Sequence, residues 1–446
     1  HEVAHGQHIL QCPLCQRTFN DEVAVLRANL HHLPEGRVMA EVQREYPLRF
    51  LASHVLGYMG YVLEQERTGQ VLPWGPPRFG LNDRVGRTGL ERSLDNILRG
   101  VDGEQVLVRK GGSEEQAKDL GDLVAALKPQ PALAGPTLVL TLDSELQRAA
   151  KTAMKDVYSG AVAVVDVHTG AIRALYSKPS FDPNTMSGKR TPGSKSTPDG
   201  AAYAPLINKA LHAFPPASTY KIVTAVAGLE EGDVRLDTAM NCPGHYDYGG
   251  RRFHCHERKG HGEVDIHTAL KVSCDVYFYR LGEALGIDRM EVWARLLGFG
   301  EHTGVELPES VGRIPTRVWY RDHVPGGYYP GFALSTAVGQ KDVLATPLQL
   351  ARIYAGIATG GVLPNLTLIE RFEDESGRSL VPDRAPPRRY ELKASTWRLL
   401  RQALRAVVNE ERGTAATSKP KTMLLAGKTG TDQAPPRVRK KKKKKL

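Results

Sequence analysis

The order of secondary-structure signals predicts an α+β protein in which a β-sheet carries helices on its faces. Two apolar runs flank the residues VHTG, which is typical of a β-hairpin with its turn at His168 to Gly170. Four later segments have helical periodicity, and the apolar stretch TMLLAGKTGT near the end of the chain predicts one more strand. The helical segments are VDIHTALKVS, GIDRMEVWARLLGF, TPLQLARIYAGIATGG and STWRLLRQALRAVV.

The chain of 446 residues is long enough for more than one domain. Near its start, the segment VGRTGLERSLDNILRG predicts a helix bounded by glycines. After a proline-rich connector, PTLVLTLDSELQRAAKTAM predicts a strand, an N-cap at Asp143 or Ser144, and an amphipathic helix. These transitions predict three regions, a first module over 1–135, a second over 136–434 and a basic, disordered tail over 435–446.

Composition narrows the class of protein. With 41% hydrophobic and 24% charged residues the chain has the balance of a globular protein, and no stretch is apolar enough to span a bilayer. The net charge of +11 comes in part from the terminal RKKKKKKL. The sequence has no zinc-finger repeat and no interleaved aromatic and basic residues, so we expect no nucleic-acid partner.

A serine and a lysine lie one helical turn apart in FPPASTYKIV. The two prolines predict an extended lead-in, and the apolar residues that follow predict a helix. Because residues three apart share a helix face, Lys221 can bring its amine to the hydroxyl of Ser218 and take its proton. The same spacing also fits an N-cap serine followed by a solvated lysine.

Two further motifs lie downstream. Residues Ser273 to Asp275 read S-C-D at a predicted junction of helix and loop, and Lys428 to Gly430 read K-T-G in a predicted strand. The combination of S-x-x-K, S-D-N and K-T-G, in this order, is the signature of serine β-lactamases and penicillin-binding proteins. Each motif alone is common by chance, whereas their joint occurrence predicts a serine nucleophile.

The residues around these motifs resemble a class B penicillin-binding protein, and within it the penicillin-binding protein 2 subfamily of elongation-specific peptidoglycan transpeptidases. Aspartate at position 275 is a mark of that subfamily. The resemblance implies a pedestal module related to dimerisation modules, then an antiparallel sheet with helices on both faces. Family members continue past K-T-G and also have a membrane anchor. The resemblance therefore implies a chain that lacks this anchor, its last strands and its C-terminal helix. The matching pieces include REYPLRFLASHVLGYMG, GRTGLERSLDNILRG, LTLDSELQ, NKALHAFPPASTYK, GHG, SCDVYFY and AVGQKDVLATPLQLA.

This resemblance implies catalytic roles for five residues. Ser218 would attack the penultimate D-alanine of a stem peptide. Lys221 would act as the base, its pKa lowered by burial and by a second cation, Lys428. Ser273 would relay the proton to the departing D-alanine, and Asp275 would hold Lys221 and the substrate amide in register.

The K-T-G motif has a substrate-binding role by the same resemblance. Lys428, Thr429 and Thr431, with Gly430 between them, would bind the terminal carboxylate. The backbone N–H groups of Ser218 and Thr431 would form the oxyanion hole. An amine from a neighbouring stem would then resolve the acyl-enzyme, whereas a β-lactam would acylate the same serine and stay.

The implied partners are stem peptides ending in D-Ala-D-Ala, β-lactams, a SEDS-family glycosyltransferase and scaffold proteins of the elongation complex. The implied location is the cell inner membrane, with the catalytic domain outside the cytoplasm. Two alternatives stay open, a hydrolytic relative (a D,D-carboxypeptidase or β-lactamase) and an inactive scaffold that retains the fold. Catalysis of this kind needs no cofactor.

Cysteines near the predicted site indicate a structural metal. Cys242, Cys255 and Cys274, with His261, have the donor set of a closed Cys3His zinc site. The alternatives are a disulfide between Cys242 and Cys255, or a ligand drawn from His245, His254 and His256. A second pair, Cys12 and Cys15 in CPLC, has no partner pair nearby, and we assign it no function.

Two positions depart from the family pattern. The usual glycine before the nucleophile is Ala217, and the residue after Gly339 and Gln340 is Lys341, which adds charge near the cleft.

Overall fold

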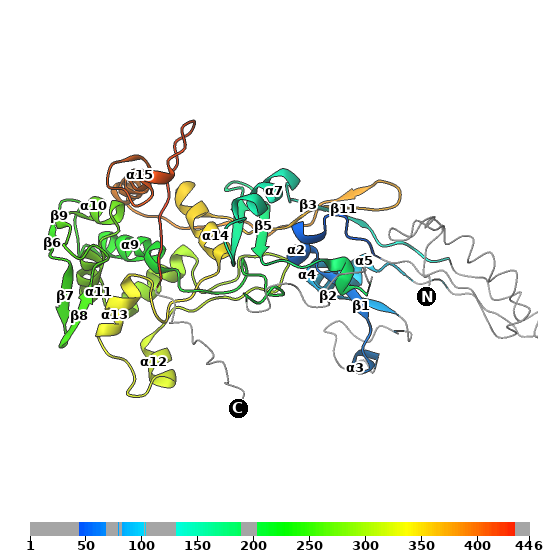
Figure 1. Cartoon of the computed structure of the whole chain (residues 1–446), viewed down its shortest axis with the longest axis horizontal. Helices are drawn as coiled ribbons and strands as arrows, with labels where there is room; N and C mark the ends of the chain where they lie inside the picture. Colours follow the sequence, from blue (N-terminus) through cyan, green and yellow to red (C-terminus); the bar gives the residue numbers. More distant parts are fainter. Residues whose placement is uncertain are drawn as a thin grey trace, which may run out of the picture. The chain divides into compact units, whose positions relative to one another are not determined.

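The structure, a computed structural model, describes residues 44–67, 79, 83–101, 103, 131–188 and 203–432. The chain divides into two compact units, each assembled from separate stretches of sequence (Figure 1). Unit 1 comprises residues 1–160, 175–208 and 369–382, and unit 2 comprises residues 161–174, 209–368 and 383–446. The predictions for Cys12, Cys15 and the basic tail lie outside the described residues.

The part of unit 1 that the structure describes contains two small antiparallel sheets and several short helices. Strand β1 (Tyr58–Tyr61) pairs with β2 (Arg84–Thr88), and β11 (Ile369–Glu373) lies between β3 (Thr137–Leu140) and β12 (Ser379–Leu380). The helices of this unit are η2 (Arg49–Leu51), α2 (Ser53–Leu56), α3 (Glu64–Arg67), α4 (Gly89–Ser93), α5 (Asp95–Leu98), α7 (Ser144–Ala153) and α8 (Pro183–Met186).

The predicted strand and capped helix after the connector are confirmed. Asp143 is the N-cap of α7, because its Oδ1 accepts hydrogen bonds from the backbone N–H groups of Glu145 and Leu146 at 2.8 and 3.0 Å. A carboxylate at this position satisfies two donors that the helix leaves unpaired.

The single helix predicted for VGRTGLERSLDNILRG is wrong. The residues from Arg84 to Thr88 form β2, and two short helices follow, separated at Leu94. Gly89 has φ +62°, a left-handed conformation that turns the chain from strand to helix. Pairing with β1 therefore overrides the helical preference of this segment.

The predicted hairpin is present as β4 (Gly160–Val165) and β5 (Ile172–Lys178). Its turn is held by Asp166, whose Oδ1 accepts from the backbone N–H groups of His168 and Thr169, each at 3.0 Å. Such a local side-chain bond fixes the turn where the sequence places it.

Unit 2 is built around helix α11 (Asp275–Leu297), which packs against α9 (Lys221–Glu231) and α13 (Gly331–Ala337) (Figure 1). The approach is close at Gly282, where a Cβ atom would lie 2.4 Å from Cβ of Ala337. The other elements of this unit are η4 (Ala217–Tyr220), β6 (Met240–Cys242), β7 (His245–Tyr248), β8 (Arg251–His254), β9 (Gly262–Val264), α10 (Ile266–Lys271), α12 (Arg317–His323), α14 (Pro347–Ala358), β10 (Val362–Leu363), β13 (Arg388–Arg389), α15 (Ala394–Asn409) and η5 (Ala416–Ser418).

All four predicted helices are confirmed, as α10, the second part of α11, α14 and α15. Helix α14 begins with a capping box, in which Thr346 and Gln349 each accept from the other's backbone N–H. None of the described helices is both long and apolar enough to cross a membrane.

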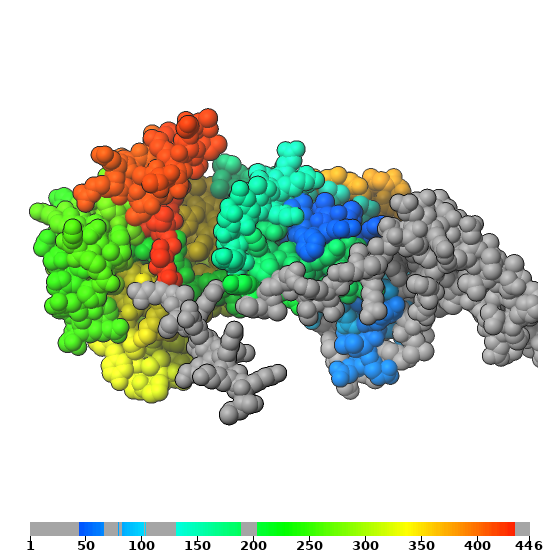
Figure 2. Space-filling view, viewed as in Figure 1, coloured from blue at the N-terminus to red at the C-terminus, as the bar shows by residue number. Residues whose placement is uncertain are grey.

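The strand predicted at TMLLAGKTGT is not formed. Its hydrogen bonds run to α15, since the N–H of Gly427 donates to Leu404 O at 3.0 Å and Asn409 Nδ2 donates to Leu425 O at 2.6 Å. A strand requires a neighbouring strand, and no described strand pairs with this segment. Figure 2 shows the end of the described chain, drawn red, at the surface of unit 2.

Candidate active site

Ser218 lies in the 3-10 turn η4, which leads directly into α9 at Lys221. The residue before it, Ala217, is buried and has φ +50°, a conformation that costs a residue with a Cβ of the order of 1–3 kcal/mol. Its N–H donates to Gly339 O at 2.8 Å, which holds the strained turn in place. The left-handed backbone explains why the family has glycine at this position.

The amine of Lys221 is completely buried, with a side-chain exposure of 0%. It donates to Asp275 Oδ1 at 2.7 Å, to Ser273 O at 2.7 Å and to Ser273 Oγ at 3.2 Å. Within the described residues it makes no hydrogen bond to Ser218, so the contact expected from helix spacing is absent. The amine is instead held by Ser273 and Asp275, which accept its hydrogen bonds.

Ser273 and Asp275 meet Lys221 because the chain turns sharply between two helices. Ser273 follows α10 with φ +56°, and Asp275 is the first residue of α11. The N–H of Cys274 donates to Ala269 O at 2.9 Å and closes the turn. Ser273 is buried, and a positive φ is strained for a residue other than glycine, so the surrounding structure must hold it in this conformation.

Asp275 is ionised in this environment. Burial opposes its charge, but the ammonium of Lys221 and hydrogen bonding from His256 more than offset burial and lower the pKa of Asp275. Its Oδ2 accepts from the backbone N–H of His256 at 2.9 Å, and His256 Nδ1 lies 3.5 Å away. The hydrogen bond to Asp275, with Cys255 nearby, raises the pKa of His256 to about 9.

Lys428 approaches the same turn from the K-T-G segment. Its Nζ donates to Ser273 Oγ at 2.8 Å. Burial and the charge of Lys221 lower the pKa of Lys428 to about 7, although Asp275 opposes the shift. The resemblance named Lys428 as a second cation near Lys221, and the two amines both contact Ser273 Oγ.

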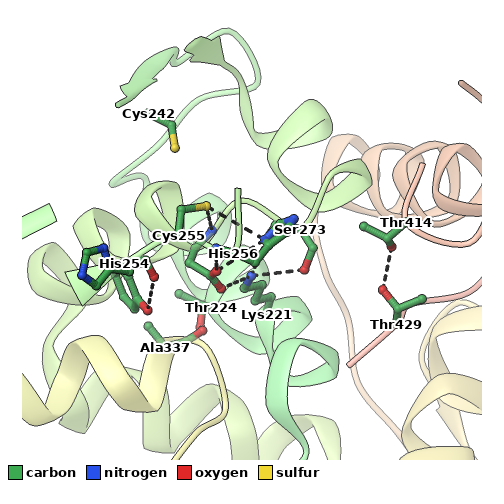
Figure 3. Close-up of polar contacts among 12 residues, drawn as sticks. Lys221, Thr224, Cys242, His254, Cys255, His256, Ser273, Ala337, Thr414 and Thr429 are labelled. Atoms are coloured by element: carbon green, nitrogen blue, oxygen red, sulfur yellow. Dashed lines mark hydrogen bonds and ion pairs between the residues drawn. The ribbon is translucent and has the colours of Figure 1, made fainter. Parts of the chain in front are cut away.

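Thr414, in the loop after α15, contacts the K-T-G segment. Its hydroxyl lies 2.6 Å from that of Thr429 (Figure 3). Gly430 lies against the serine turn, where a Cβ atom would be 2.9 Å from Pro216 O. These contacts place the segment beside Ser218 although it is not part of a sheet.

These residues line one cleft of about 790 Å³. The predicted catalytic and substrate-binding residues on its surface are Ser218, Ser273, Asp275, Thr429, Gly430 and Thr431. Lys221 and Lys428 lie behind them and reach the cleft through Ser273. The cleft thus combines a serine hydroxyl, two amines that share one neighbouring hydroxyl, and the K-T-G residues.

The predicted cysteine cluster assembles at the edge of this cleft. The Sγ atoms of Cys242 and Cys255 lie 3.6 and 3.5 Å from His261 Nδ1, and one ligand atom from each of these residues and from Cys274 lies within 4.8 Å of the others. All three cysteines are free, so the alternative disulfide between Cys242 and Cys255 is not formed. Figure 3 shows Cys255 beside His256 and Ser273, with Cys242, the last residue of β6, on a separate segment.

The cluster is linked to the catalytic residues through Asp275, whose N–H donates to Cys255 Sγ at 3.4 Å. A hydrogen bond between the two thiols lowers the pKa of Cys255 and raises the pKa of Cys274. Cys255 is therefore the more acidic thiol of the pair. Thiolate is the form that binds metal ions.

Sequence reasoning did not predict the contacts of two residues that line the cleft, Thr414 and His256, the second of which contacts Asp275. Thr414 lies within no motif that we considered, and only its contact with Thr429 identifies it. His256 was considered only as an alternative metal ligand; the structure places it against the carboxylate of Asp275, and together with Cys255 and Asp275 it forms a second group of potential ligands.

Comparison with known proteins gives matches over both parts of the chain. Residues 160–445 match the family model of the penicillin binding protein transpeptidase domain, and residues 11–140 match that of the penicillin-binding protein dimerisation domain. The peptidoglycan D,D-transpeptidase MrdA of Escherichia coli K12 is 28% identical over 441 residues, which cover 97% of this chain and 68% of that relative.

Two solved structures have a similar fold. PBP2 of Helicobacter pylori, in its complex with MreC, has a TM-score of 0.75 at 27% identity and covers 92% of this chain and 74% of its own. A chain from a peptidoglycan synthase complex that coordinates polymerization and crosslinking has a TM-score of 0.71 at 32% identity, covering 93% of this chain and 71% of its own.

Proposed function

The chain belongs to the penicillin-binding protein family, in the group that includes PBP2, and from this premise we propose that it is a peptidoglycan D,D-transpeptidase acting through Ser218. The observation that carries the proposal is the convergence of Lys221 and Lys428 on Ser273 in the cleft that Ser218 lines. The reaction is the cross-linking of stem peptides during cell elongation.

In this proposal Ser218 Oγ attacks the carbonyl carbon of the penultimate D-alanine, and its proton passes to Lys221, which acts as the base in its neutral form. The backbone N–H groups of Ser218 and Thr431 stabilise the resulting oxyanion. When the C–N bond breaks, the departing D-alanine takes a proton through Ser273, whose hydroxyl is hydrogen-bonded to Lys221 Nζ and Lys428 Nζ. The amine of a second stem then displaces Ser218 from the acyl group.

Asp275 keeps the buried amine of Lys221 in position through the 2.7 Å contact between them. Lys428, Thr429 and Thr431 bind the terminal carboxylate of the peptide, a task suited to an ammonium and two hydroxyls. β-Lactams carry a carboxylate and a reactive carbonyl, so they acylate Ser218 in the same way.

The cysteine cluster is proposed as a structural zinc site formed by Cys242, Cys255, His261 and Cys274. A tetrahedral zinc with ordinary bond lengths separates a thiolate sulfur from an imidazole nitrogen by about 3.5 Å. The separations from His261 Nδ1, 3.6 and 3.5 Å, fit this geometry. A zinc ion there would neutralise the thiolates and fix the turn that carries Ser273 and Asp275.

The zinc proposal is tested by elemental analysis of the purified chain and by thermal unfolding. We expect about one zinc per chain, a lower Tm after chelation, and a comparable loss of Tm in Cys255→Ser. His245→Ala is the control, since His245 lies on β7 outside the cluster. An unchanged transition after chelation, together with the absence of zinc, would contradict the proposal.

We assign residues 1–135 to the pedestal and 136–434 to the catalytic domain, which we place outside the cytoplasm at the inner membrane. The proposed partners are a SEDS-family glycosyltransferase and elongation-complex scaffold proteins. Support comes from the similar PBP2 solved with MreC and from the similar chain of the synthase complex.

The function is tested by labelling the purified chain with a fluorescent penicillin and locating the adduct by mass spectrometry. We expect a stable adduct on Ser218 and none in Ser218→Ala. The control Ser395→Ala changes a serine of α15 outside the cleft and should label normally. A folded protein without an adduct would favour the inactive scaffold, and rapid release of the label would favour a hydrolytic relative.

A further inference from the structure

One wall of the active-site cleft carries an excess of positive charge. The strand β8 and the loop after it contribute Arg251, Arg252 and Arg258 to the surface of the cleft that Ser218 also lines. The single carboxylate among the lining residues is Asp275, and it is already paired with Lys221. No carboxylate among the lining residues is therefore free to pair with these arginines.

The three arginines differ in their partners. Arg252 is neutralised by Asp247, to which its Nε and Nη2 donate at 2.8 and 2.9 Å. The guanidinium of Arg251 lies over the ring of Phe253, 5.3 Å from its centre. Neither Arg251 nor Arg258 forms an ion pair or a side-chain hydrogen bond with any residue that the structure describes.

The position of these two side chains is set by the fold of the wall. Strand β8 pairs with β7 in register, with Arg251 opposite Tyr248 at the turn of the hairpin. The loop that carries Arg258 is held at the base of the hairpin, where the N–H of Cys255 donates to Gly244 O at 2.9 Å. Arg251 and Arg258 thus extend from an ordered element beside the cleft.

We propose that Arg251 and Arg258 recognise a second carboxylate on the donor peptide, upstream of its D-Ala-D-Ala end. This inference rests on the proposed function, in which the K-T-G segment takes the terminal carboxylate. A guanidinium matches the planar geometry of a carboxylate and can bind it through two hydrogen bonds. The cleft, at about 790 Å³, lies in the range of pockets that bury ligands larger than a dipeptide.

The test uses two synthetic peptides that both end in D-Ala-D-Ala. One peptide has a free carboxylate two residues upstream of its C-terminal residue, and the other has a carboxamide at the same place. Each peptide competes with fluorescent penicillin for Ser218, and the ratio of their inhibition constants is measured. We expect the carboxylate peptide to compete about fivefold better, a size typical of solvent-accessible ion pairs. The preference should decrease in high salt, which screens such pairs.

In the variant with Arg251→Gln and Arg258→Gln together, the ratio should fall to about one. The control is Arg317→Gln and Arg321→Gln together, because both arginines are exposed, are paired with Asp288 and Asp322 and lie on α12 outside the cleft, yet their loss removes the same charge from the domain. If the double variant does not fold, the effect of salt on the carboxylate preference of the unmodified protein still tests the inference.

The outcomes separate this inference from the proposed function. If penicillin does not label the unmodified chain at Ser218, the proposed function fails. If penicillin labels it but the two peptides compete equally, the second carboxylate site is wrong. The same conclusion follows if the double variant keeps the full preference, or if polyglutamate without a D-Ala-D-Ala end competes as well as the carboxylate peptide.

Discussion

Lys428 Nζ donates a hydrogen bond of 2.8 Å to Ser273 Oγ, and this places a second amine beside a hydroxyl that Lys221 already contacts. Burying two ammonium groups beside one hydroxyl, away from water, lowers the free energy of unfolding. The cost appears in the pKa of Lys428, which burial and Lys221 lower from 10.5 to about 7. Asp275 compensates only one of the two charges directly, through its ion pair with Lys221.

This arrangement predicts that Lys428→Met stabilises the protein in a pH-dependent way. Between about pH 7 and 10.5 the unfolded chain binds a proton at Lys428 that the folded chain does not, so the free energy of unfolding of the unmodified protein rises with pH. Below pH 7 the full cost of burying the ammonium is present. We expect Lys428→Met to raise the free energy of unfolding by a few kcal/mol at about pH 6 and by progressively less toward about pH 10.

Denaturant unfolding at several pH values measures this difference. Lys419→Met serves as the matched control, because Lys419 is an exposed lysine close in sequence. A stabilisation by Lys428→Met that stays constant with pH would contradict the lowered pKa of Lys428, as would a loss of stability at low pH.

The sequence predicted which side chains meet at the cleft, because the three motifs have fixed chemical content. It did not predict that the pKa of Lys428 is lowered. That depends on how deeply each lysine is buried and on which carboxylate it meets, and both follow from the turn between α10 and α11. Helix spacing also placed Lys221 against Ser218, whereas its amine donates to Ser273 and Asp275, two partners that lie more than 50 residues further along the chain.

The ion pair between Lys221 and Asp275 predicts strong coupling in a double-mutant cycle. Removing either partner leaves the other charge buried and uncompensated, which typically costs about 3–5 kcal/mol. We expect Lys221→Met and Asp275→Asn each to lower the free energy of unfolding by about 3 kcal/mol, and the double variant to lose less than the sum. Denaturant unfolding of the four proteins measures the coupling, and additive losses would show that the pair contributes no joint stabilisation.

The contact between Thr414 and Thr429 predicts a kinetic effect with little change in stability. Thr414→Val keeps the shape of the side chain but removes the hydroxyl that lies 2.6 Å from Thr429 Oγ1. Loss of one such hydrogen bond is worth about 1 kcal/mol, so we expect the rate of penicillin acylation to fall about fivefold. Because both groups are solvent-accessible, Tm should change little.

Thr152→Val is the control for Thr414→Val, since it removes a hydroxyl that donates to Arg148 O in α7, outside the cleft. Equal acylation rates for Thr414→Val and the unmodified protein would show that Thr429 does not depend on this contact.

The prediction of a strand at TMLLAGKTGT failed for a physical reason. Residue preferences describe how well a segment fits a sheet, but a strand forms only when a neighbour supplies its hydrogen bonds. Here the neighbour is α15, through Gly427 and Asn409. The predictions for α7 and α14 succeeded because capping residues act within one turn of the chain, so local sequence determines them.

The close approach of Gly430 to the serine turn predicts that added bulk at this position slows acylation. A Cβ atom there would lie 2.9 Å from Pro216 O and 3.2 Å from Thr219 Cγ2, and the backbone carbonyl cannot move without moving the turn that carries Ser218. We expect Gly430→Ala to reduce the rate of penicillin acylation by about 10- to 100-fold, since small displacements of reacting groups have effects of this size.

The neighbouring Gly427 is the matched control for Gly430→Ala. A Cβ at Gly427 would meet only Val408 Cγ2 at 3.9 Å, an ordinary contact, so Gly427→Ala should acylate at close to the unmodified rate. Both variants should keep Tm within a few degrees, because the segment is largely exposed. Equal acylation by the two variants would mean that the K-T-G segment does not need its contact with the turn of Ser218, and the geometry proposed for the oxyanion hole would then be wrong.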